Sequence, residues 1–353
     1  MGLAAKLAAH GIVNAENTGV TQFISTGYPP LDKALSARWV GGGLPSGRVI
    51  EMFGPPSAGK TAISTNAMVN AQADGGLAIF QDHENSFDEE LGVGFGLNTD
   101  PNFWVYNKPD TFEQSIDQVE KILKTARALE FKNGRFVPTG EEPLFPMDKP
   151  IVVVFDSLAS MVPQSTLSDS KGKEKDTSDR NMNDNTALAR ATSAHFPRIA
   201  LLAERANATL IFLNQVRTKL GVMYGDPTTT PGGGAPEYYA SVRIKLGRSM
   251  ILSADKKTKL GQQIGAEVVK NKVVAPFQKA EWSFLFEEDG SGRFDVIGGV
   301  IDALIDIGKI ERAGAWITWD GKKWNSREAL HNHITLKGQY PDLIALFPRD
   351  TDD

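Results

Sequence analysis

The segment GPPSAGKT at residues 54–61 limits what this chain can fold into more than any other feature. It matches the pattern G-x-x-x-x-G-K-[ST], and it lies between an apolar run that ends at Phe53 and the helix-patterned stretch TAISTNAMVNAQA. In this context glycines let backbone amides close around phosphates, a helix N-terminus adds positive potential, and the lysine and threonine reach phosphate oxygens and Mg²⁺. A Gly/Pro turn that only opens a helix is the competing interpretation, which the full match in its expected context disfavours. We therefore predict a nucleotide-phosphate site formed by Gly54, Pro55, Pro56, Ser57, Ala58, Gly59, Lys60 and Thr61.

Short apolar segments alternate with helix-patterned stretches from about Val49 to Phe286. Such alternation is typical of βαβ units and predicts an α/β fold around a mostly parallel sheet. After this region the character of the chain changes, and a helix, a turn and a hairpin at Asp320-Gly321 predict a small separate module. We expect strands at residues 48–53, 77–81, 151–156, 209–214 and 241–246, and a hairpin-like run at 266–286.

The chain of 353 residues is longer than one typical domain, and we divide it into three parts. These are a short N-terminal arm at 1–30, a core at 31–288, and a small α+β domain with a tail at 289–353. The first residues, MGLAAKLAAHGIV, are typical of an amphipathic helix rather than a signal peptide. The apolar runs are too short to cross a bilayer, and the absence of cysteine excludes disulfides and thiolate metal sites. We expect a soluble cytoplasmic protein that does not associate with membranes.

Acidic residues follow two of the predicted strands. The strand IVVVFD ends in Asp156, where a carboxylate would face Thr61 across a bound Mg²⁺. The strand LAIFQ is followed by Asp82, Glu84 and Asp88, any of which could orient or deprotonate an attacking water. Each of the three could equally be a solvated loop carboxylate. The residues alone leave this choice open.

Two long polar segments are candidates for contact with nucleic acid. The net charge of -5 gives no global attraction to it, so such contact has to be local. Residues 165–185 are mixed in charge and poor in apolar side chains, which predicts a long loop. Residues 216–235 follow a strand that ends in Asn214 and Gln215, and they are rich in glycine. A loop of that length without structure is uncommon unless it is functional, although a plain surface loop remains the alternative.

Five segments resemble the bacterial RecA family, and they occur in the family's order. They are ISTGYPPLDKAL, GGGLPSGRVIEMFGPPSAGKT, FLNQVRTKLGVMYGDPTTTPGGGAPEYYASVRI, VVKNKVVAPF and ERAGAW. Because these segments are spread along the sequence, the resemblance covers nearly the whole chain. The resemblance implies a RecA-type ATPase core that uses ATP and Mg²⁺ to assemble a head-to-tail filament on single-stranded DNA and pair it with homologous duplex. The divergence fits a member carried by a phage or another mobile element, although the sequence itself does not show the source.

The resemblance also implies roles for individual residues. Glu84 becomes the residue that activates water, with Lys60 on the phosphates, and Gln215 becomes the sensor of the γ-phosphate that passes its state to the following loop. Asp88 and Asp156 join the nucleotide and metal sites. The family's DNA-contacting loops fall at about 164–186 and 216–235, with Arg180, Met182, Arg217, Lys219, Met223, Gly232 and Gly233 as candidate contacts.

Three further positions are assigned to the boundary between protomers. Lys270 and Lys272 lie two apart on a predicted strand and therefore on one face, where paired cations usually mark only a solvated edge. The resemblance implies that they reach the nucleotide of the neighbouring protomer, and that Tyr238 packs at the same interface. In contrast, Leu91 stands where many relatives have an adenine-stacking tyrosine, and both the N-terminal arm and the acidic tail are short.

Other functions share this type of core. A ring helicase or packaging motor would form closed rings and lack the glycine-rich segment. An ATP-gated single-strand binder or mediator would coat DNA without pairing homologues. A small-molecule kinase would need a lid and an acceptor site, which the sequence does not indicate.

Overall fold

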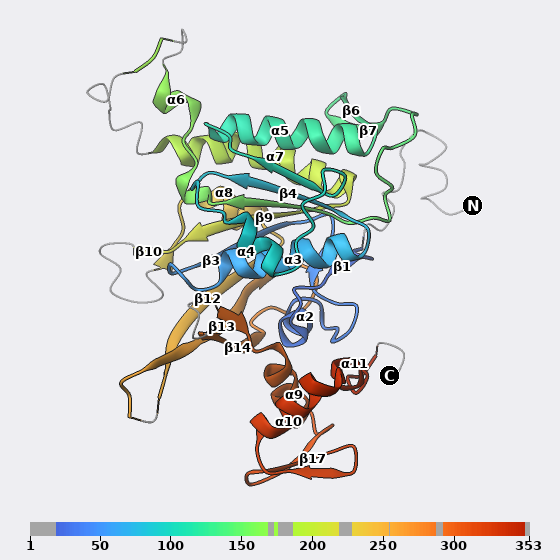
Figure 1. The fold of residues 1–353 in the computed structure, drawn as a ribbon. Helices are drawn as coiled ribbons and strands as arrows, with labels where there is room; N and C mark the ends of the chain where they lie inside the picture. The colour runs from blue at the N-terminus through green and yellow to red at the C-terminus, as the bar shows by residue number, and fades with distance from the viewer. Residues whose placement is uncertain are drawn as a thin grey trace.

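The structure is a computed structural model that describes residues 19–168, 173–175, 186–218, 228–253, 255–286 and 292–349. Its centre is a nine-stranded sheet with the order β15-β14-β13-β12-β3-β9-β8-β4-β5 (Figure 1). The register of the pairs from β12 to β5 is parallel throughout. These six strands are β3 (Val49–Gly54), β4 (Leu77–Asp82), β5 (Trp104–Asn107), β8 (Ile151–Asp156), β9 (Ala208–Gln215) and β12 (Val242–Leu252).

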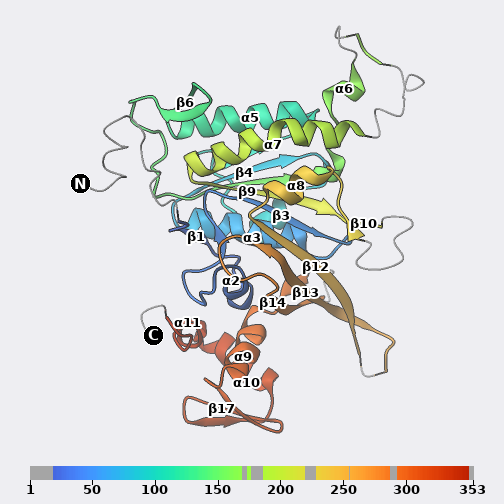
Figure 2. The ribbon, with the colours of Figure 1, turned by 180° about the vertical axis from the view of Figure 1, so that it is seen from behind.

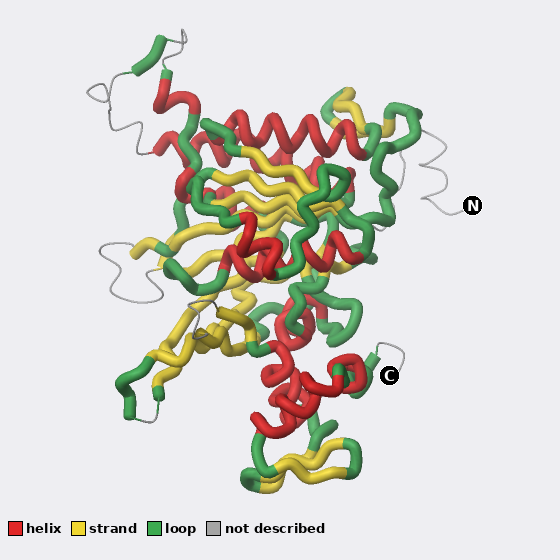
Figure 3. The backbone as a smooth tube through the Cα atoms, in the orientation of Figure 1, coloured by secondary structure: helices red, strands yellow, loops and turns green. Residues whose placement is uncertain are grey.

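Helices cover both faces of the parallel strands, as Figure 3 shows. Because alternate strand residues point to opposite faces, the sheet supports two apolar cores. One lies under α3 (Lys60–Ala73), and the other under α5 (Phe112–Ala126) and α7 (Ala187–Ala206). The strands β3, β4, β8 and β9 are almost completely buried, which explains their continuous apolar sequences. Their carboxyl ends meet at one edge, which is where ligands bind in folds of this kind.

The other end of the sheet is antiparallel. β12 pairs with β13 (Lys259–Asn271), followed by β14 (Lys279–Phe286) and β15 (Gly292–Phe294). Only the residues from Val242 to Lys245 of β12 pair with β3, and the rest of the β12–β13 ribbon projects from the body (Figures 1 and 2). The predicted strand at 241–246 is therefore too short. The hairpin-like run at 266–286 is confirmed by the antiparallel pairing of β13 with β14, but its first strand begins earlier, at Lys259. Polar residues misled the prediction, because an antiparallel ribbon with solvated faces need not be apolar.

The C-terminal residues form a separate apolar core, but β15 still belongs to the main sheet. The sheet thus extends to Phe294, beyond the limit of 288 expected for the core. The predicted hairpin at Asp320-Gly321 is confirmed by the pairing of its two strands. The elements of this part are α9 (Val296–Asp306), β16 (Glu311–Ala313), β17 (Trp316–Trp319), β18 (Lys322–Trp324), α10 (Arg327–Lys337) and α11 (Tyr340–Ile344).

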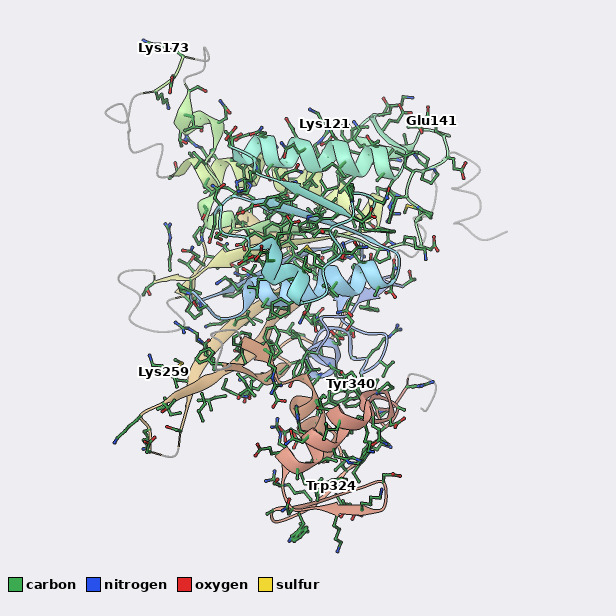
Figure 4. The ribbon with its side chains drawn as sticks, in the orientation of Figure 1. Lys121, Glu141, Lys173, Lys259, Trp324 and Tyr340 are labelled. Carbon is green, nitrogen blue, oxygen red and sulfur yellow. The ribbon has the colours of Figure 1, made fainter. Side chains whose placement is uncertain are left out.

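Short elements surround the sheet, and several correct the predicted loops. The segment at 165–185 begins inside α6 (Gln164–Leu167), and Lys173 marks its outer part in Figure 4. The segment at 216–235 contains the paired strands β10 (Arg217–Thr218) and β11 (Thr228–Thr229) and the start of α8 (Gly234–Tyr239). The remaining elements are β1 (Phe23–Ile24), α2 (Pro29–Ser36), β2 (Leu44–Pro45), α4 (Glu89–Gly94), β6 (Leu129–Lys132), β7 (Arg135–Pro138) and the 3-10 turn η1 (Leu158–Ser160). Among the described residues, no helix is long and apolar enough to span a membrane.

Candidate nucleotide site

The phosphate loop connects β3 to the N-terminus of α3. Gly59 has a φ of 81° in the left-handed region, and a Cβ atom there would lie 3.0 Å from Cδ1 of Ile264, so glycine suits both the turn and the close approach. Nζ of Lys60 donates to the carbonyl oxygens of Gly54 at 3.2 Å and Pro55 at 3.0 Å, which holds the cation over the loop. Burial lowers the pKa of Lys60, while the carboxylates of Asp156 and Glu84 oppose this effect. The loop thus offers a helix N-terminus and one cation to a phosphate.

The predicted metal ligands lie in direct contact. Oγ1 of Thr61 donates to Oδ2 of Asp156 at 2.8 Å. Burial raises the pKa of Asp156 to about 6, and the nearby charges of Glu84 and Asp82 add to this increase. A hydroxyl and a carboxylate oxygen are ligands that suit Mg²⁺, so Thr61 and Asp156 would hold this cation, which would neutralise charge on a bound phosphate. The donor set therefore fits the metal that the sequence predicts.

The structure separates the three acidic candidates. Asp82 is buried and accepts hydrogen bonds from the Tyr106 hydroxyl at 2.8 Å and from the Glu84 amide at 3.0 Å. It therefore shapes the turn that carries Glu84. Asp88 accepts from the Leu91 amide at 3.1 Å and caps the N-terminus of α4, although it also lines the cavity described below. Of the three, Glu84 is the one whose carboxylate contacts the end of β9.

Glu84 is held where three elements meet. Its Oε1 atom accepts hydrogen bonds from the Ser157 hydroxyl, from the Ser160 hydroxyl at 3.1 Å and from Nε2 of Gln215 at 3.5 Å. The predicted base and the predicted γ-phosphate sensor are thus adjacent, although 131 positions separate them in the sequence. Sequence reasoning did not single out Ser160, which follows β8 in η1.

A cavity of about 560 Å³ joins these residues to an apolar region. Lys60, Thr61, Asp156, Glu84 and Gln215 line its polar end. Its other end, built mainly by strands at the antiparallel side of the sheet, was missed because apolar strand residues look like ordinary core. An apolar slot beside a phosphate loop suits a flat purine ring. This end is lined by Leu91, Phe95, Ile264, Phe284, Phe286 and Phe294.

Lys270 and Lys272 do not line this cavity. Nζ of Lys270 donates to the carbonyl oxygens of Glu237 at 2.5 Å and Tyr238 at 3.0 Å, and Nζ of Lys272 donates to Tyr238 at 3.5 Å. Burial is the main cause that lowers the pKa of Lys270, and the positive charge of Lys272 lowers it further. Both lysines therefore lie on one face, as predicted, and contact the C-terminal end of α8. The side chain of Tyr238 beside them is 70% exposed.

The candidate DNA contacts are only partly described. Arg217 is exposed in β10, two positions after Gln215, the predicted γ-phosphate sensor. Gly232 and Gly233 pack closely on neighbouring elements, because added Cβ atoms would lie 2.9 Å from Pro236 and 2.8 Å from Ala189. They thus have a packing role whatever else they contact. The predicted contacts Arg180, Met182, Lys219 and Met223 lie outside the described residues.

The parallel sheet, the phosphate loop and the carboxylate at the end of β8 define a P-loop nucleoside triphosphatase. The chain belongs to the RecA family: the family model of the RecA N-terminal domain matches residues 8–130 and 147–291. The chain is 33% identical to Protein RecA of Desulforapulum autotrophicum over 88% of this chain and 78% of that protein. It is 36% identical to Protein RecA of Mycobacterium ulcerans over 89% of this chain and 79% of that protein.

This membership gives the chain its function. It is a DNA-dependent ATPase of homologous recombination that pairs homologous DNA and exchanges strands. The ring motor, the mediator and the small-molecule kinase are therefore set aside. The relatives reported above are bacterial proteins and give no support to an origin in a phage.

Proposed function

We propose that the cavity above α3 binds ATP with Mg²⁺ and that hydrolysis there is the step that single-stranded DNA stimulates. The observation that carries this proposal is the meeting of Glu84, Gln215 and the phosphate loop at one end of the cavity. Lys60 binds the β and γ phosphates, and Thr61 with Asp156 hold the cation. When bound, Mg²⁺ neutralises charge on the phosphates. The aromatic end of the cavity holds the base.

Glu84 acts as the general base. Its three side-chain contacts all reach Oε1, so among the described residues Oε2 is left to accept a proton from water. The two serine hydroxyls fix the carboxylate, and Gln215 approaches it from the end of β9. The side chain of Gln215 can therefore donate a hydrogen bond either to Glu84 or to a γ-phosphate. Its position depends on the bound nucleotide, and this change passes to the segment at 216–235 that follows it.

The DNA sites of this proposal lie on one side of the molecule. The described ends of the two predicted DNA-contacting segments, at α6 and at β10, lie on one side of the molecule in both Figures 1 and 2. Arg217 contacts a phosphate of single-stranded DNA there. Because the overall charge is -5, the affinity for single-stranded DNA comes from local cations such as Arg217.

Each ATP is shared between two protomers. One protomer contributes Lys60, Glu84 and Gln215. The neighbouring protomer contributes Lys270 and Lys272, whose ammonium groups leave the carbonyl oxygens of their own α8 to reach the nucleotide. The support is that both lysines lie away from the cavity of their own chain and beside the exposed Tyr238. Such a head-to-tail interface is heterologous and builds open filaments.

The direct test combines three measurements on the intact chain. ATP turnover is measured with and without single-stranded DNA, filaments are imaged in the same buffer, and strand exchange is compared for homologous and unrelated duplex. We expect stimulation of turnover, helical filaments and exchange with the homologous duplex alone. Closed rings, or DNA coating without exchange, would refute the proposal.

The shared site has its own test, in which two inactive variants are mixed on single-stranded DNA. One is Glu84→Gln, and the other carries Lys270→Ala and Lys272→Ala. With random mixing, about a quarter of the interfaces unite an intact Glu84 with intact lysines, so part of the turnover returns. If both variants enter the same filaments and no mixing ratio restores hydrolysis, the lysines do not act across the interface.

A further inference from the structure

Asn214 is a fully buried amide that joins the two ends of the glycine-rich segment. Its Nδ2 donates to Oε1 of Glu51 at 2.9 Å and to the carbonyl oxygen of Pro231 at 3.0 Å, while its Oδ1 accepts from the Gln215 amide at 3.0 Å. Glu51 and Pro231 present only acceptors, and the Gln215 amide presents only a donor. The side chain therefore has a single orientation that satisfies all three partners.

Glu51 anchors this amide from the strand that leads into the phosphate loop. Its side chain is 1% exposed, and both of its oxygens are used, since Oε2 accepts from Nε of Arg243 at 2.7 Å. Arg243 also lies 3.3 Å from the carboxylate of Glu237 in α8 and 4.8 Å from the ring centroid of Phe53. A buried carboxylate of this kind is costly unless each oxygen is paired. Glu51 thus ties β3 to β9, β12 and α8 at one point.

We propose that Glu51 and Asn214 are positioning residues that couple the nucleotide to DNA affinity. The proposal rests on the proposed role of Gln215 as the γ-phosphate sensor. When the side chain of Gln215 shifts toward a phosphate, the backbone moves with it, and the backbone N–H of Gln215 pulls on Oδ1 of Asn214. Because the amide group is planar and rigid, that movement changes the bond from Nδ2 to Pro231 as well. Pro231 lies three positions before the start of α8 at Gly234, so both described ends of the segment respond together.

The substitution Glu51→Gln tests this relay with almost no change in shape. If the glutamine oxygen keeps its bond to Arg243, its amide faces the amide of Asn214, and two donors oppose each other. If Asn214 then turns over, its Nδ2 faces the Gln215 amide and again two donors meet. If instead the new side chain turns its oxygen toward Asn214, its amide opposes Nε of Arg243. Every arrangement therefore loses at least one hydrogen bond of Glu51 or Asn214, whereas neither substituted residue lines the cavity.

The measured quantity is the coupling factor, which is the ratio of single-stranded DNA affinities with a non-hydrolysable ATP analogue and with ADP. By linkage, DNA changes the preference for the analogue over ADP by the same factor, so the effect is measured twice. We expect Glu51→Gln to lower the coupling factor about tenfold in both directions, within the usual range of allosteric couplings. A purely structural defect would lower the melting temperature and both affinities without changing their ratio.

Glu120→Gln is the matched control. Glu120 pairs with Arg198 at 2.7 Å and 2.6 Å between α5 and α7, so this variant also loses a glutamate–arginine pair but lies on other elements. It should retain the wild-type coupling factor. If it loses coupling as Glu51→Gln does, the effect is a general loss of stability and the relay is wrong.

The double variant Glu51→Gln with Asn214→Asp separates the two halves of the relay. The new amide at position 51 can then accept from Arg243 and donate to the new carboxylate at position 214, which still accepts from the backbone N–H of Gln215. Only the bond to Pro231 is lost, because a carboxylate has no donor. We expect stability to recover while the coupling factor stays low, and recovery of coupling would overturn the role of Pro231.

If the Glu51→Gln protein does not fold, the coupling factor is measured on the double variant alone. A coupling factor of about one in the wild-type protein, which means equal DNA affinity with the ATP analogue and with ADP, would contradict the proposed function itself. Wild-type coupling that survives in both variants would contradict only the relay.

Discussion

Glu84→Gln is the substitution that most directly tests the chemistry of the site. Glutamine keeps the length and shape of the side chain, and its Oε1 can still accept from the Ser157 and Ser160 hydroxyls. What is lost is the negative charge and the ability to take a proton from water. The structure therefore predicts a defect in turnover without a defect in ATP binding.

The expected size follows from the role of a general base. Such a group contributes about 10²- to 10⁴-fold to a rate, which corresponds to about 3–5 kcal/mol of transition-state stabilisation. Steady-state turnover with saturating single-stranded DNA should therefore fall at least about 100-fold, while KM for ATP stays within about threefold. Removal of an anion near the phosphates does not weaken the binding of ATP, so stable filaments should persist.

Asp88→Asn is the matched control for this experiment. Asp88 lines the same cavity and the change removes the same charge, but asparagine caps a helix as well as aspartate does. The turnover rate at saturating ATP should stay within about threefold of wild type, because a nucleotide contact of Asp88 would change KM for ATP rather than the transfer of the proton. A Glu84→Gln protein that hydrolyses ATP near the wild-type rate, or an Asp88→Asn protein that is equally impaired, would show that Glu84 is not the base.

Three further variants test other parts of the site. Lys60→Ala should abolish nucleotide-dependent DNA binding with the fold retained, since it removes the cation over the phosphate loop; normal turnover in a folded protein would contradict this assignment. Arg217→Ala should lower the slope of log affinity for single-stranded DNA against log salt concentration by about 0.7, and an unchanged slope would remove Arg217 from the DNA path. Burial lowers the pKa of His83 to about 4, so its contribution to stability is complete above about pH 6.5 and is lost as the pH falls toward 4. The difference in unfolding free energy between wild type and His83→Asn should shrink by up to about 3 kcal/mol over that interval, and a constant difference would mean that His83 does not titrate as expected.

The sequence predicts the part of the site that depends on local motifs. GPPSAGKT and the strand that ends in Asp156 place Lys60, Thr61 and the carboxylate at one sheet edge, because parallel strands bring their carboxyl ends together. The choice among Asp82, Glu84 and Asp88 could not be made this way. The contact of Asp82 with Tyr106 favours a structural role for Asp82, and Tyr106 lies on β5, a strand that periodicity did not reveal.

Residues that act through tertiary contacts were harder to assign from the sequence. No motif marks Phe284, Phe286 or Phe294 as part of a site, and only the fold of the antiparallel strands brings them to the cavity beside the phosphate loop. The lysine pair at 270 and 272 was expected on one face, but its contact with the carbonyls of α8 depends on a helix that the sequence did not predict and that begins at the end of a predicted loop. Spacing along the chain contains no information about such a partner.

Leu91 departs from the family inside the cavity, but a longer departure lies away from the site. The family match omits residues 131–146, which include most of the β6–β7 hairpin and the stretch that follows it. Arg127 holds this stretch by donating to the carbonyl oxygens of Phe145 and Lys149, and Arg198 stacks 3.8 Å from the ring centroid of Phe131. In Figures 1 and 4 this end of the molecule, marked by Glu141, lies opposite to α6 and β10. Because the added segment packs on α5 and α7 and contributes nothing to the cavity lining, the chain can diverge there without changing the residues that bind and hydrolyse ATP.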